Sequence, residues 1–401
     1  MRGRLTSRDV LLTIEDYRRL ARRRLPRVVF DFIDGGAETE LTQSENQRAF
    51  ERVWFRPHVG APAGLPDLTT ELFGRELSMP VIIAPTGLGR IANPVGDLAG
   101  VRAAGQAGTA FALAMAAGYS LEEIAQARSG PIWFQIYDVG GREAVERTIE
   151  RAARARYDAL IVTFDTPVAG KRERDQRNGA MALLGPRTLG KLPYVPQLIM
   201  KPRWFFRRIS DGLVPVTPNI EGGVRSHASG ARGGPVGARS LCWTDLEWVR
   251  SAWSGPILVK GILTAEDARR AVDAGVNGVI VSNHGGRQLD GAVSSLSVLP
   301  EIAAAVGNRC EILLDSGIRR GSDVVKALSL GAKAVLIGRP WLYGLAAAGQ
   351  EGIEGVLAIL RADIDRTMQL MGRARLADLD RSAVRAPPEW FDFEECRFPR
   401  R

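Results

Sequence analysis

Residues 257–290, ILVKGILTAEDARRAVDAGVNGVIVSNHGGRQLD, contain two short apolar runs separated by a segment with a helical pattern. The runs at 257–260 and 278–282 are predicted strands, and the segment between them is long enough for a crossover helix. A strand, a helix and a second strand form the repeating unit of a parallel sheet. The second strand ends in a glycine-rich loop that carries His284 and Arg287, so this stretch predicts a site as well as a fold.

The same alternation continues from Met79 to Gly338 and predicts eight strands. Several runs are continuously apolar, as expected for parallel strands that are covered on both faces. Eight strand-helix units that close on themselves form a (β/α)8 TIM barrel, an α/β fold. A doubly wound sheet is the alternative, but it requires Gly-x-Gly-x-x-Gly after the first strand, which residues 85–89 do not supply. The predicted strands are residues 80–84, 109–113, 132–136, 159–163, 257–260, 278–282, 311–315 and 334–338.

Two regions lie outside these units. Residues 13–24 are a predicted helix with a capping box at Thr13 and Asp16, and Pro26 begins a second helical stretch to Phe32. Between the fourth and fifth strands, residues 179–240 form a long excursion, and such loops are usually functional or disordered. Residues 352–371 are a predicted final helix. The expected divisions are an N-terminal helical extension (1–78), a barrel (79–379) that contains the excursion (179–240), and a tail (380–401).

The composition is that of a globular protein. The 401 residues are 45% hydrophobic and 25% charged, which is sufficient for one large barrel. The cysteines are Cys242, Cys310 and Cys396, and the histidines are His58, His227 and His284. The cysteine spacing provides no disulfide framework, so a reducing, cytoplasmic setting is expected. The histidine spacing excludes a histidine-rich metal site.

The net charge of +9 is concentrated in the excursion, where nine lysines and arginines accompany only Asp211 and Glu221. Residues 201–209 place Trp204, Phe205 and Phe206 among four cations. Such a segment can dock on an anionic membrane surface, or it can form a solvated lid over the site. We expect no nucleic-acid binding, because no recognition module is present. The sequence contains neither a signal peptide nor a spanning apolar run, so the protein is expected to be cytoplasmic or peripheral on the inner face of the plasma membrane.

Polar residues follow six consecutive predicted strands, at the end of a barrel where active sites lie. The third strand ends at Gln135 and Tyr137 and the fourth at Thr163 and Asp165, with Arg172 beyond. The remaining groups are Lys260, residues 282–287, residues 315–319, and Gly338 with Arg339. Surface charges do not explain six such endings in succession. They predict a site.

The chemistry of these groups suggests an acid substrate. His284 can take a proton, while Arg287 can hold a carboxylate through two parallel hydrogen bonds. The glycines of the last two loops, with Arg319 and Arg339, are typical of a phosphate site in such barrels. Lys260 is costly to bury alone, so we expect an electron-rich cofactor edge beside it, with a structural ion pair as the alternative.

An ordered set of short motifs along the chain matches the pattern of a known protein family. They are Leu25-Pro26, Gly35-Gly36-Ala37, Ala84-Pro85-Thr86, residues 134–137, Asp165-Thr166-Pro167 with Arg172, Val259-Lys260-Gly261, residues 282–290, residues 315–321 and Gly338-Arg339. With these motifs, residues 13–379 resemble the FMN-dependent 2-hydroxy-acid oxidase and dehydrogenase family, which includes glycolate oxidase and lactate dehydrogenase. Residues 201–209 and 265–290 are most similar to mandelate dehydrogenase.

The resemblance implies FMN as cofactor and a role for each site residue. His284 would remove the α-hydrogen or hydroxyl proton, with Asp165 stabilising its imidazolium. Arg172 and Arg287 would bind the carboxylate, and Tyr137 the hydroxyl or developing oxyanion. The flavin ring would contact Pro85, Thr86, Gly87, Gln135, Thr163 and Ser282, with Lys260 at its N1/O2 edge. The ribityl and phosphate would be held by Asp315, Gly317, Arg319, Gly338 and Arg339. A homotetramer is also implied.

Three positions depart from the family pattern. Phe32 replaces the usual tyrosine that contacts the carboxylate, which removes a hydrogen bond worth roughly 1.5 to 3 kcal/mol. Ala114 replaces a common serine or threonine, and Ala116 stands where some members carry a bulky residue. We therefore expect a larger, less polar pocket and a bulky or aromatic L-2-hydroxy acid, with a quinone or oxygen as oxidant. A modified peptide or biosynthetic intermediate is the alternative substrate.

Overall fold

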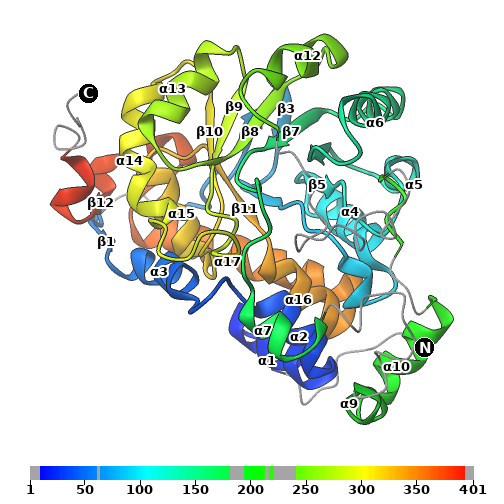
Figure 1. Ribbon diagram of the computed structural model, residues 1–401. Coiled ribbons are helices and arrows are strands. Elements are labelled where there is room, and N and C mark those ends of the chain that lie inside the picture. The colour runs from blue at the N-terminus through cyan, green and yellow to red at the C-terminus, as the bar shows by residue number, and fades with distance from the viewer. Residues whose placement is uncertain (1–9, 61–63, 181–193, 213–215, 221–240, 393–401) are drawn as a thin grey trace.

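The computed structural model describes residues 10–60, 64–180, 194–212, 216–220 and 241–392, and its centre is a closed barrel of eight parallel strands (Figure 1). The order around the barrel is β10-β11-β4-β5-β6-β7-β8-β9. The strands are β4 (Val81–Ile83), β5 (Phe111–Ala114), β6 (Ile132–Ile136), β7 (Ala159–Thr163), β8 (Ile257–Ile262), β9 (Gly278–Val281), β10 (Glu311–Leu314) and β11 (Ala334–Ile337). All eight predicted strands and the TIM barrel are confirmed. The predicted fifth strand was too short, because β8 continues past an irregularity at Gly261.

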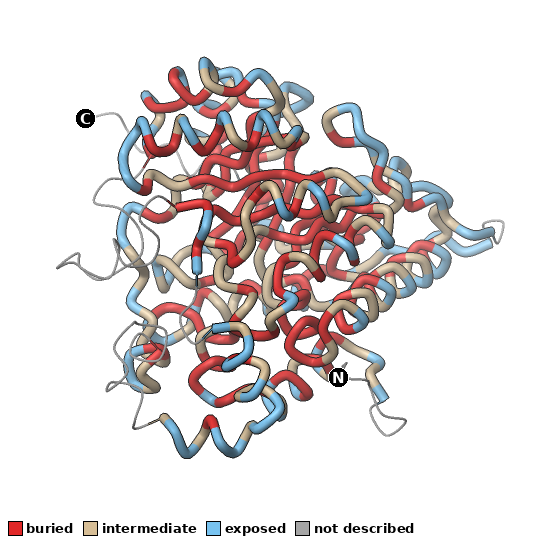
Figure 2. The backbone as a smooth tube through the Cα atoms, turned by 90° about the vertical axis from the view of Figure 1, so that its right-hand side faces the viewer, coloured by how far each residue is buried: buried red, intermediate tan, exposed pale blue. Residues whose placement is uncertain are grey.

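Helices surround this barrel and bury their inner faces against it, as Figure 2 shows for the tube coloured by burial. They are α4 (Gly96–Gln106), α5 (Leu121–Ala127), α6 (Arg142–Arg154), α12 (Asp245–Ala252), α13 (Ala265–Asp273), α14 (Ser295–Val306), α15 (Gly321–Ser329), α16 (Arg339–Ala348) and α17 (Gln350–Leu370). The predicted final helix corresponds to α17.

One end of the barrel is closed by a hairpin. Alternate strand residues such as Ile161 and Ile280 point into the barrel, as the two-residue period of a strand requires. The hairpin strands β2 (Thr70–Leu72) and β3 (Arg75–Leu77) add Leu72 and Leu77 to this inner core. Between them, the Phe73 ring packs edge-on to Trp133 at 5.7 Å. The inner core therefore fills the barrel away from the carboxyl ends of its strands.

The N-terminal extension contains α1 (Ile14–Arg24), α2 (Arg27–Asp34) and α3 (Leu41–Glu51). The capping box at Thr13 and Asp16 is present, and Pro26 is the N-cap of α2. Helix α2 continues past Phe32 to Asp34, whose buried carboxylate accepts hydrogen bonds from Arg18, Arg174 and Tyr343. Strand β1 (Trp54–Phe55) pairs with β12 (Val384–Arg385), which links this extension to the C-terminal segment. That segment also contains η3 (Leu376–Asp378), η4 (Arg381–Ala383) and η5 (Pro388–Phe391).

Besides α12, the described part of the β7–β8 connection contains three short helices: α7 (Glu173–Arg177), α9 (Val195–Ile199) and α10 (Pro202–Ser210). Figure 1 shows α7 beside α1 and α2, whereas α9 and α10 lie at the periphery. Helix α10 contains nearly all of the predicted aromatic and basic segment. The other excursion charges lie outside the described residues, as do one histidine and one cysteine; these are Arg187, Lys191, Glu221, Arg225, Arg232, Arg239, His227 and Cys396.

Candidate active site

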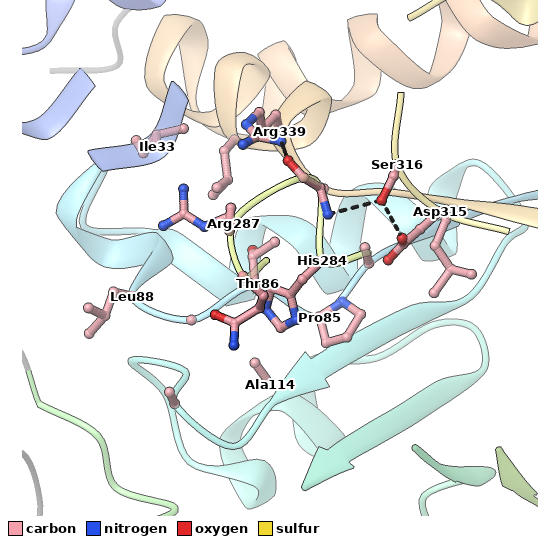
Figure 3. A pocket seen from close by; sticks show the side chains of 18 of the residues that line it. Ile33, Pro85, Thr86, Leu88, Ala114, His284, Arg287, Asp315, Ser316 and Arg339 are labelled. Atoms are coloured by element: carbon pink, nitrogen blue, oxygen red, sulfur yellow. Dashed lines mark hydrogen bonds between the residues drawn. The ribbon is translucent and has the colours of Figure 1, made fainter. Parts of the chain in front are cut away.

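A cavity of about 240 Å³ lies at the carboxyl ends of the barrel strands. It is lined by fifteen of the predicted site residues: Phe32, Pro85, Thr86, Gly87, Ala116, Tyr137, Arg172, Lys260, His284, Arg287, Asp315, Gly317, Arg319, Gly338 and Arg339. Figure 3 shows part of this lining. Gln135, Thr163 and Ser282 are buried and do not line the cavity. Residues far apart in the sequence therefore meet where the parallel strands end.

The imidazole of His284 is held by a carboxylate. Its Nδ1 lies 2.9 Å from Asp165 Oδ1. A carboxylate acceptor keeps the proton on Nδ1 and leaves Nε2 as the basic nitrogen. Burial would raise the pKa of Asp165, but attraction to His284 and Lys260 outweighs burial and lowers this pKa. Asp165 is therefore charged and suited to stabilise an imidazolium.

Lys260 is a buried cation surrounded by oxygen acceptors. Its Nζ donates to Ser282 Oγ at 2.8 Å and lies 3.4 Å from Asp315 Oδ2 and 3.7 Å from Asp165 Oδ2. Burial would lower the pKa of Lys260, but attraction to Asp315 and Asp165 raises it well above its ordinary value. The cavity therefore contains a permanent positive charge where the sequence predicts the flavin edge.

Two arginines flank the aromatic ring of Phe32. The guanidinium carbons of Arg172 and Arg287 lie 5.9 and 5.5 Å from the ring centroid, within the range of cation–π attraction. Arg287 Nη1 also donates to the carbonyl oxygens of Phe32 and Gly35, at 3.0 and 2.8 Å. Arg172 Nε donates to Asp175 Oδ2 at 2.8 Å. Although Phe32 lacks a phenol, its ring contacts both arginines of the predicted carboxylate-binding pair, and its carbonyl helps to orient Arg287.

The charge at this part of the cavity favours an anion. Burial, together with repulsion from Arg172 and Arg339, lowers the pKa of Arg287 to about 9. A carboxylate between Arg172 and Arg287 would offset this repulsion through charge-assisted hydrogen bonds. Burial, reinforced by the charge of Asp165, raises the pKa of Tyr137 to about 12, so its phenol stays protonated and can donate to a substrate oxygen.

Polar atoms that lack a partner lie where the flavin ring is predicted. Thr86 Oγ1 and Gln135 Oε1 are buried without a hydrogen-bond partner. Gln135 Nε2 is fixed by Thr163 Oγ1 at 3.0 Å and by the carbonyl of Ile136 at 2.8 Å. Buried polar atoms are normally satisfied, and Thr86 lines the cavity, so its orphaned hydroxyl fits a ligand that carries hydrogen-bonding groups.

The N-terminus of α16, at the cavity, suits a phosphate. Gly338 is the N-cap of α16, and a Cβ at this position would meet only Thr86 Cγ2, at 3.7 Å. Free space therefore adjoins the first N–H groups of a ten-residue helix, an arrangement that binds anions. Arg319 also lines the cavity, and Asp315 accepts a hydrogen bond from Ser316 Oγ at 2.7 Å.

The guanidinium of Arg339 is held by four hydrogen bonds to protein acceptors, which its place in the sequence did not predict. Its Nε donates to the Asp34 carbonyl at 3.1 Å, and its Nη1 to the Gly285 carbonyl at 2.8 Å. Its Nη2 donates at 2.8 Å to both the Gly35 carbonyl and Gln43 Oε1. The guanidinium thus fastens α16 to the N-terminal extension and the β9 loop. Its predicted role in phosphate binding stays a prediction.

Sequence reasoning missed several apolar side chains that line the cavity, among them Ile33, Leu88, Ile91, Val139, Ile220 and Leu342. Leu88 and Val139 closely follow the first and third strands, so attention to apolar strand-end residues would have found them. Ile33 and Ile220 come from outside the barrel, and no sequence signal marked them. Figure 3 shows Ile33 and Leu88 on the side of the pocket opposite Asp315.

Comparison with known proteins identifies this arrangement. Residues 21–386 match the FMN-dependent dehydrogenase family. The chain belongs to this family. It is 39% identical over 383 residues to a peroxisomal (S)-2-hydroxyacid oxidase of Arabidopsis thaliana, covering 95% of this chain and 98% of the relative. It is 41% identical over 371 residues to (S)-mandelate dehydrogenase of Pseudomonas putida, covering 90% and 91%. A crystal structure of the monotopic membrane protein (S)-mandelate dehydrogenase matches with a TM-score of 0.87 and 39% identity, over 94% of this chain and 100% of that one.

The chain is therefore an FMN-dependent oxidoreductase of the 2-hydroxy-acid oxidase and dehydrogenase family. Its cavity fits FMN: the orphaned Thr86 hydroxyl and the Lys260 cation line it, and free space at Gly338 adjoins the N-terminus of α16.

Proposed function

We propose that this FMN-dependent enzyme oxidises a bulky or aromatic L-2-hydroxy acid to the 2-oxo acid. The observation that carries the proposal is the convergence of the His284–Asp165 pair with Arg172 and Arg287 beside the residues that fit FMN. Each of these groups has a defined task in acid oxidation.

The substrate carboxylate lies between Arg172 and Arg287, and Tyr137 donates to the hydroxyl oxygen. His284 accepts a proton from the substrate through Nε2, and Asp165 stabilises the resulting imidazolium. FMN would supply the two-electron acceptor, so the hydroxy acid loses two protons and two electrons overall. Lys260 offers a fixed positive charge that would balance the negative charge of the reduced flavin.

Substrate size is inferred from the apolar part of the cavity. Phe32, Leu88, Ile91 and Val139 line the cavity, and Ala116 presents only a methyl group to it. A phenyl or branched side chain would bury against these groups, whereas glycolate would leave them in contact with water. The two relatives named above act on 2-hydroxy acids and mandelate, respectively, which supports this substrate class. A modified peptide or biosynthetic intermediate is the second candidate, because Phe32 lacks the usual phenol.

We also propose that α9 and α10 dock on an anionic membrane, where a quinone could accept electrons. Ile199, Met200, Phe206 and Ile209 are exposed on these two helices, near Lys201, Arg203 and Arg207. None of the described helices is long and apolar enough to cross a bilayer, so the proposed contact is interfacial. The similar mandelate dehydrogenase structure carries the description of a monotopic membrane protein. A lid role, an oxygen-using reaction and the tetramer implied by resemblance stay alternatives or predictions.

The three predicted aromatics of α10 do not form one exposed patch. Phe206 is 69% exposed, but Trp204 and Phe205 are only partly exposed and pack against the core. The Trp204 indole N–H donates to the Ile91 carbonyl at 2.8 Å. The docking face is therefore better represented by Phe206 and Ile209 than by all three aromatics.

Anaerobic flavin bleaching tests the proposed reaction. The purified protein should release FMN on denaturation, and its bound flavin should bleach with L-mandelate or another bulky L-2-hydroxy acid. His284→Ala should keep FMN but lose substrate reduction by several orders of magnitude, because the base acts in the chemical step. Normal reduction by His284→Ala, or no bleaching by any hydroxy acid, would overturn the proposal. Bleaching by a modified peptide alone would favour the second candidate.

A further inference from the structure

Three charged side chains join α10 to the turn that follows the first barrel strand. Arg90, in the 3-10 turn η1 (Gly89–Ile91), forms an ion pair with Asp211, the C-cap residue of α10. Arg208 Nη1 donates to the other oxygen of Asp211 at 2.8 Å. The side chains of Arg208 and Asp211 are each only 8% exposed. Two largely buried guanidinium groups therefore depend on one carboxylate.

Arg90 is held by contacts on several sides, so a shift of Asp211 would also shift the turn that contains Arg90. Its Nη1 donates to the Gly118 carbonyl at 2.9 Å, and its guanidinium stacks 4.5 Å from the Tyr119 ring centroid. A Cβ at Gly118 would approach Arg90 Cδ to 2.4 Å, and one at Gly96 would approach Cγ to 2.6 Å. The Arg90 stem thus lies between two glycines with no space to move sideways.

Helix α10 holds the same turn at a second point. Besides the ion pair, the Trp204 indole donates to the backbone carbonyl of Ile91, the last residue of η1. Ile91 and Leu88, at the two ends of this turn, line the cavity. Leu88 lies on the side opposite Asp315 in Figure 3, where the substrate side chain is proposed to bind. Two side chains of the excursion therefore support one apolar wall of the pocket from behind.

We propose that Asp211 and Trp204 are positioning residues that hold this wall, so that α10 sets the affinity for bulky 2-hydroxy acids. The inference rests on the proposed function, because it assigns Leu88 and Ile91 to the substrate side chain. Neither Asp211 nor Trp204 lines the cavity, and both act through η1. Small acids that do not reach Leu88 and Ile91 are bound by the arginine pair alone.

The test compares Asp211→Asn and Trp204→Phe with the wild type, using L-mandelate as the bulky substrate and L-lactate as the small one. Each variant should raise KM for mandelate about tenfold, while kcat and the KM for lactate change less than threefold. Asp211→Glu should restore most of the mandelate affinity, because it keeps the carboxylate. Binding of phenylacetate and acetate, followed by perturbation of the flavin spectrum, should show the same contrast without turnover.

Lys201→Met is the matched control on the same helix. Lys201 Nζ donates to the Arg23 carbonyl at 2.6 Å and so ties the start of α10 to α1 rather than to η1. This variant should leave both substrates unchanged. Equal losses for mandelate and lactate, or no loss in Trp204→Phe, would overturn the inference even if Asp211→Asn failed to fold. A wild type that oxidises neither acid would instead contradict the proposed function.

Discussion

The N-terminal extension and the β7–β8 excursion both lie outside the barrel, yet they reach the cavity in different ways. The extension contributes the Phe32 ring and gives backbone carbonyls to Arg287 and Arg339. The described part of the excursion contributes Ile220 and supports the cavity from behind through Arg90. The extension thus holds the charged groups of the site, whereas α10 supports an apolar wall. Substitutions that break the contacts of the extension should therefore lower both stability and activity. Substitutions that break the contacts of α10 with the turn should change substrate selectivity.

Two buried aspartates near these regions differ in how their charge is balanced. Asp34, at the end of α2, is paired with Arg18 and Arg174; burial would raise its pKa, but these partners and Tyr343 hold the pKa well below its usual range. Asp97, in α4 near Arg90, accepts a hydrogen bond from Gly118 N at 3.1 Å, and burial raises its pKa to about 6. The carboxylate of Asp34 stabilises the fold, whereas that of Asp97 opposes it at neutral pH.

The largest effect is expected for Asp34→Ala. Removing this carboxylate leaves Arg18 and Arg174 without their buried partner, and breaking such a pair typically costs about 3 to 5 kcal/mol. Because the folded pKa is depressed, the stabilisation is present above the unfolded pKa of about 4 and is lost as pH falls towards the folded value. Urea unfolding at pH 7 should show a lower midpoint, together with weaker FMN retention.

Asp273→Asn provides a surface control for that measurement. Asp273 is 71% exposed and lies 3.4 Å from Arg309, so its pair should contribute less than about 1 kcal/mol. Similar losses in Asp34→Ala and Asp273→Asn would contradict the view that the extension is fixed by a buried charge.

A gain in stability is expected for Asp97→Asn. An amide oxygen can still accept from Gly118 N, but no charge is buried. Because the folded pKa is raised, the wild type pays its penalty above pH 6, and the penalty disappears as pH falls below about 4. The variant should exceed the wild type by up to about 3 kcal/mol at pH 7.5, and this advantage should shrink at pH 4.5. An advantage that does not change with pH would mean that the pKa of Asp97 is the same in the folded and unfolded states, and would contradict the raised pKa.

The sequence predicted the barrel and much of the cavity lining for one physical reason. Parallel strands place their carboxyl ends together, so Tyr137, Lys260 and His284 could be grouped before their distances were known. The features that the sequence did not predict depend on contacts between segments that are far apart in the chain. The pairing of Arg90 with Asp211 is not encoded by local periodicity, and neither are the carbonyls that occupy Arg339. The distribution of exposure along α10 also needed the structure, because Trp204 and Phe206 look alike in a linear sequence.

A smaller effect is expected for Phe32→Tyr. The added phenol would restore a donor near the substrate carboxylate and should improve KM for lactate or glycolate about tenfold, consistent with a charged hydrogen bond of roughly 1.5 kcal/mol. The aromatic ring that contacts Arg172 and Arg287 would be kept. Steady-state kinetics with lactate, glycolate and mandelate would measure this gain.

Phe32→Leu separates the phenol from the ring. It removes the cation–π contacts at 5.5 and 5.9 Å and should weaken binding of every carboxylate substrate several-fold. If Phe32→Tyr gives no gain with any small acid while FMN content is intact, the pocket is built for another substrate class, and the modified-peptide alternative is strengthened.

The smallest effect on turnover is expected for the double variant Phe206→Ser, Ile209→Ser. Both side chains are exposed on α10, and they are distinct from Trp204 and Asp211, which contact η1. Reduction of a soluble dye should therefore stay within about twofold of the wild type, since no group that touches the cavity is changed.

Wild-type protein should sediment with anionic vesicles at low salt and be released as salt rises, because charge attraction is screened over ~8 Å at physiological ionic strength. The variant should stay in solution and lose quinone reduction in parallel. If the wild type does not bind these vesicles even at low salt, α10 is a solvated support of the pocket wall alone, and a soluble oxidant such as oxygen becomes the preferred electron acceptor.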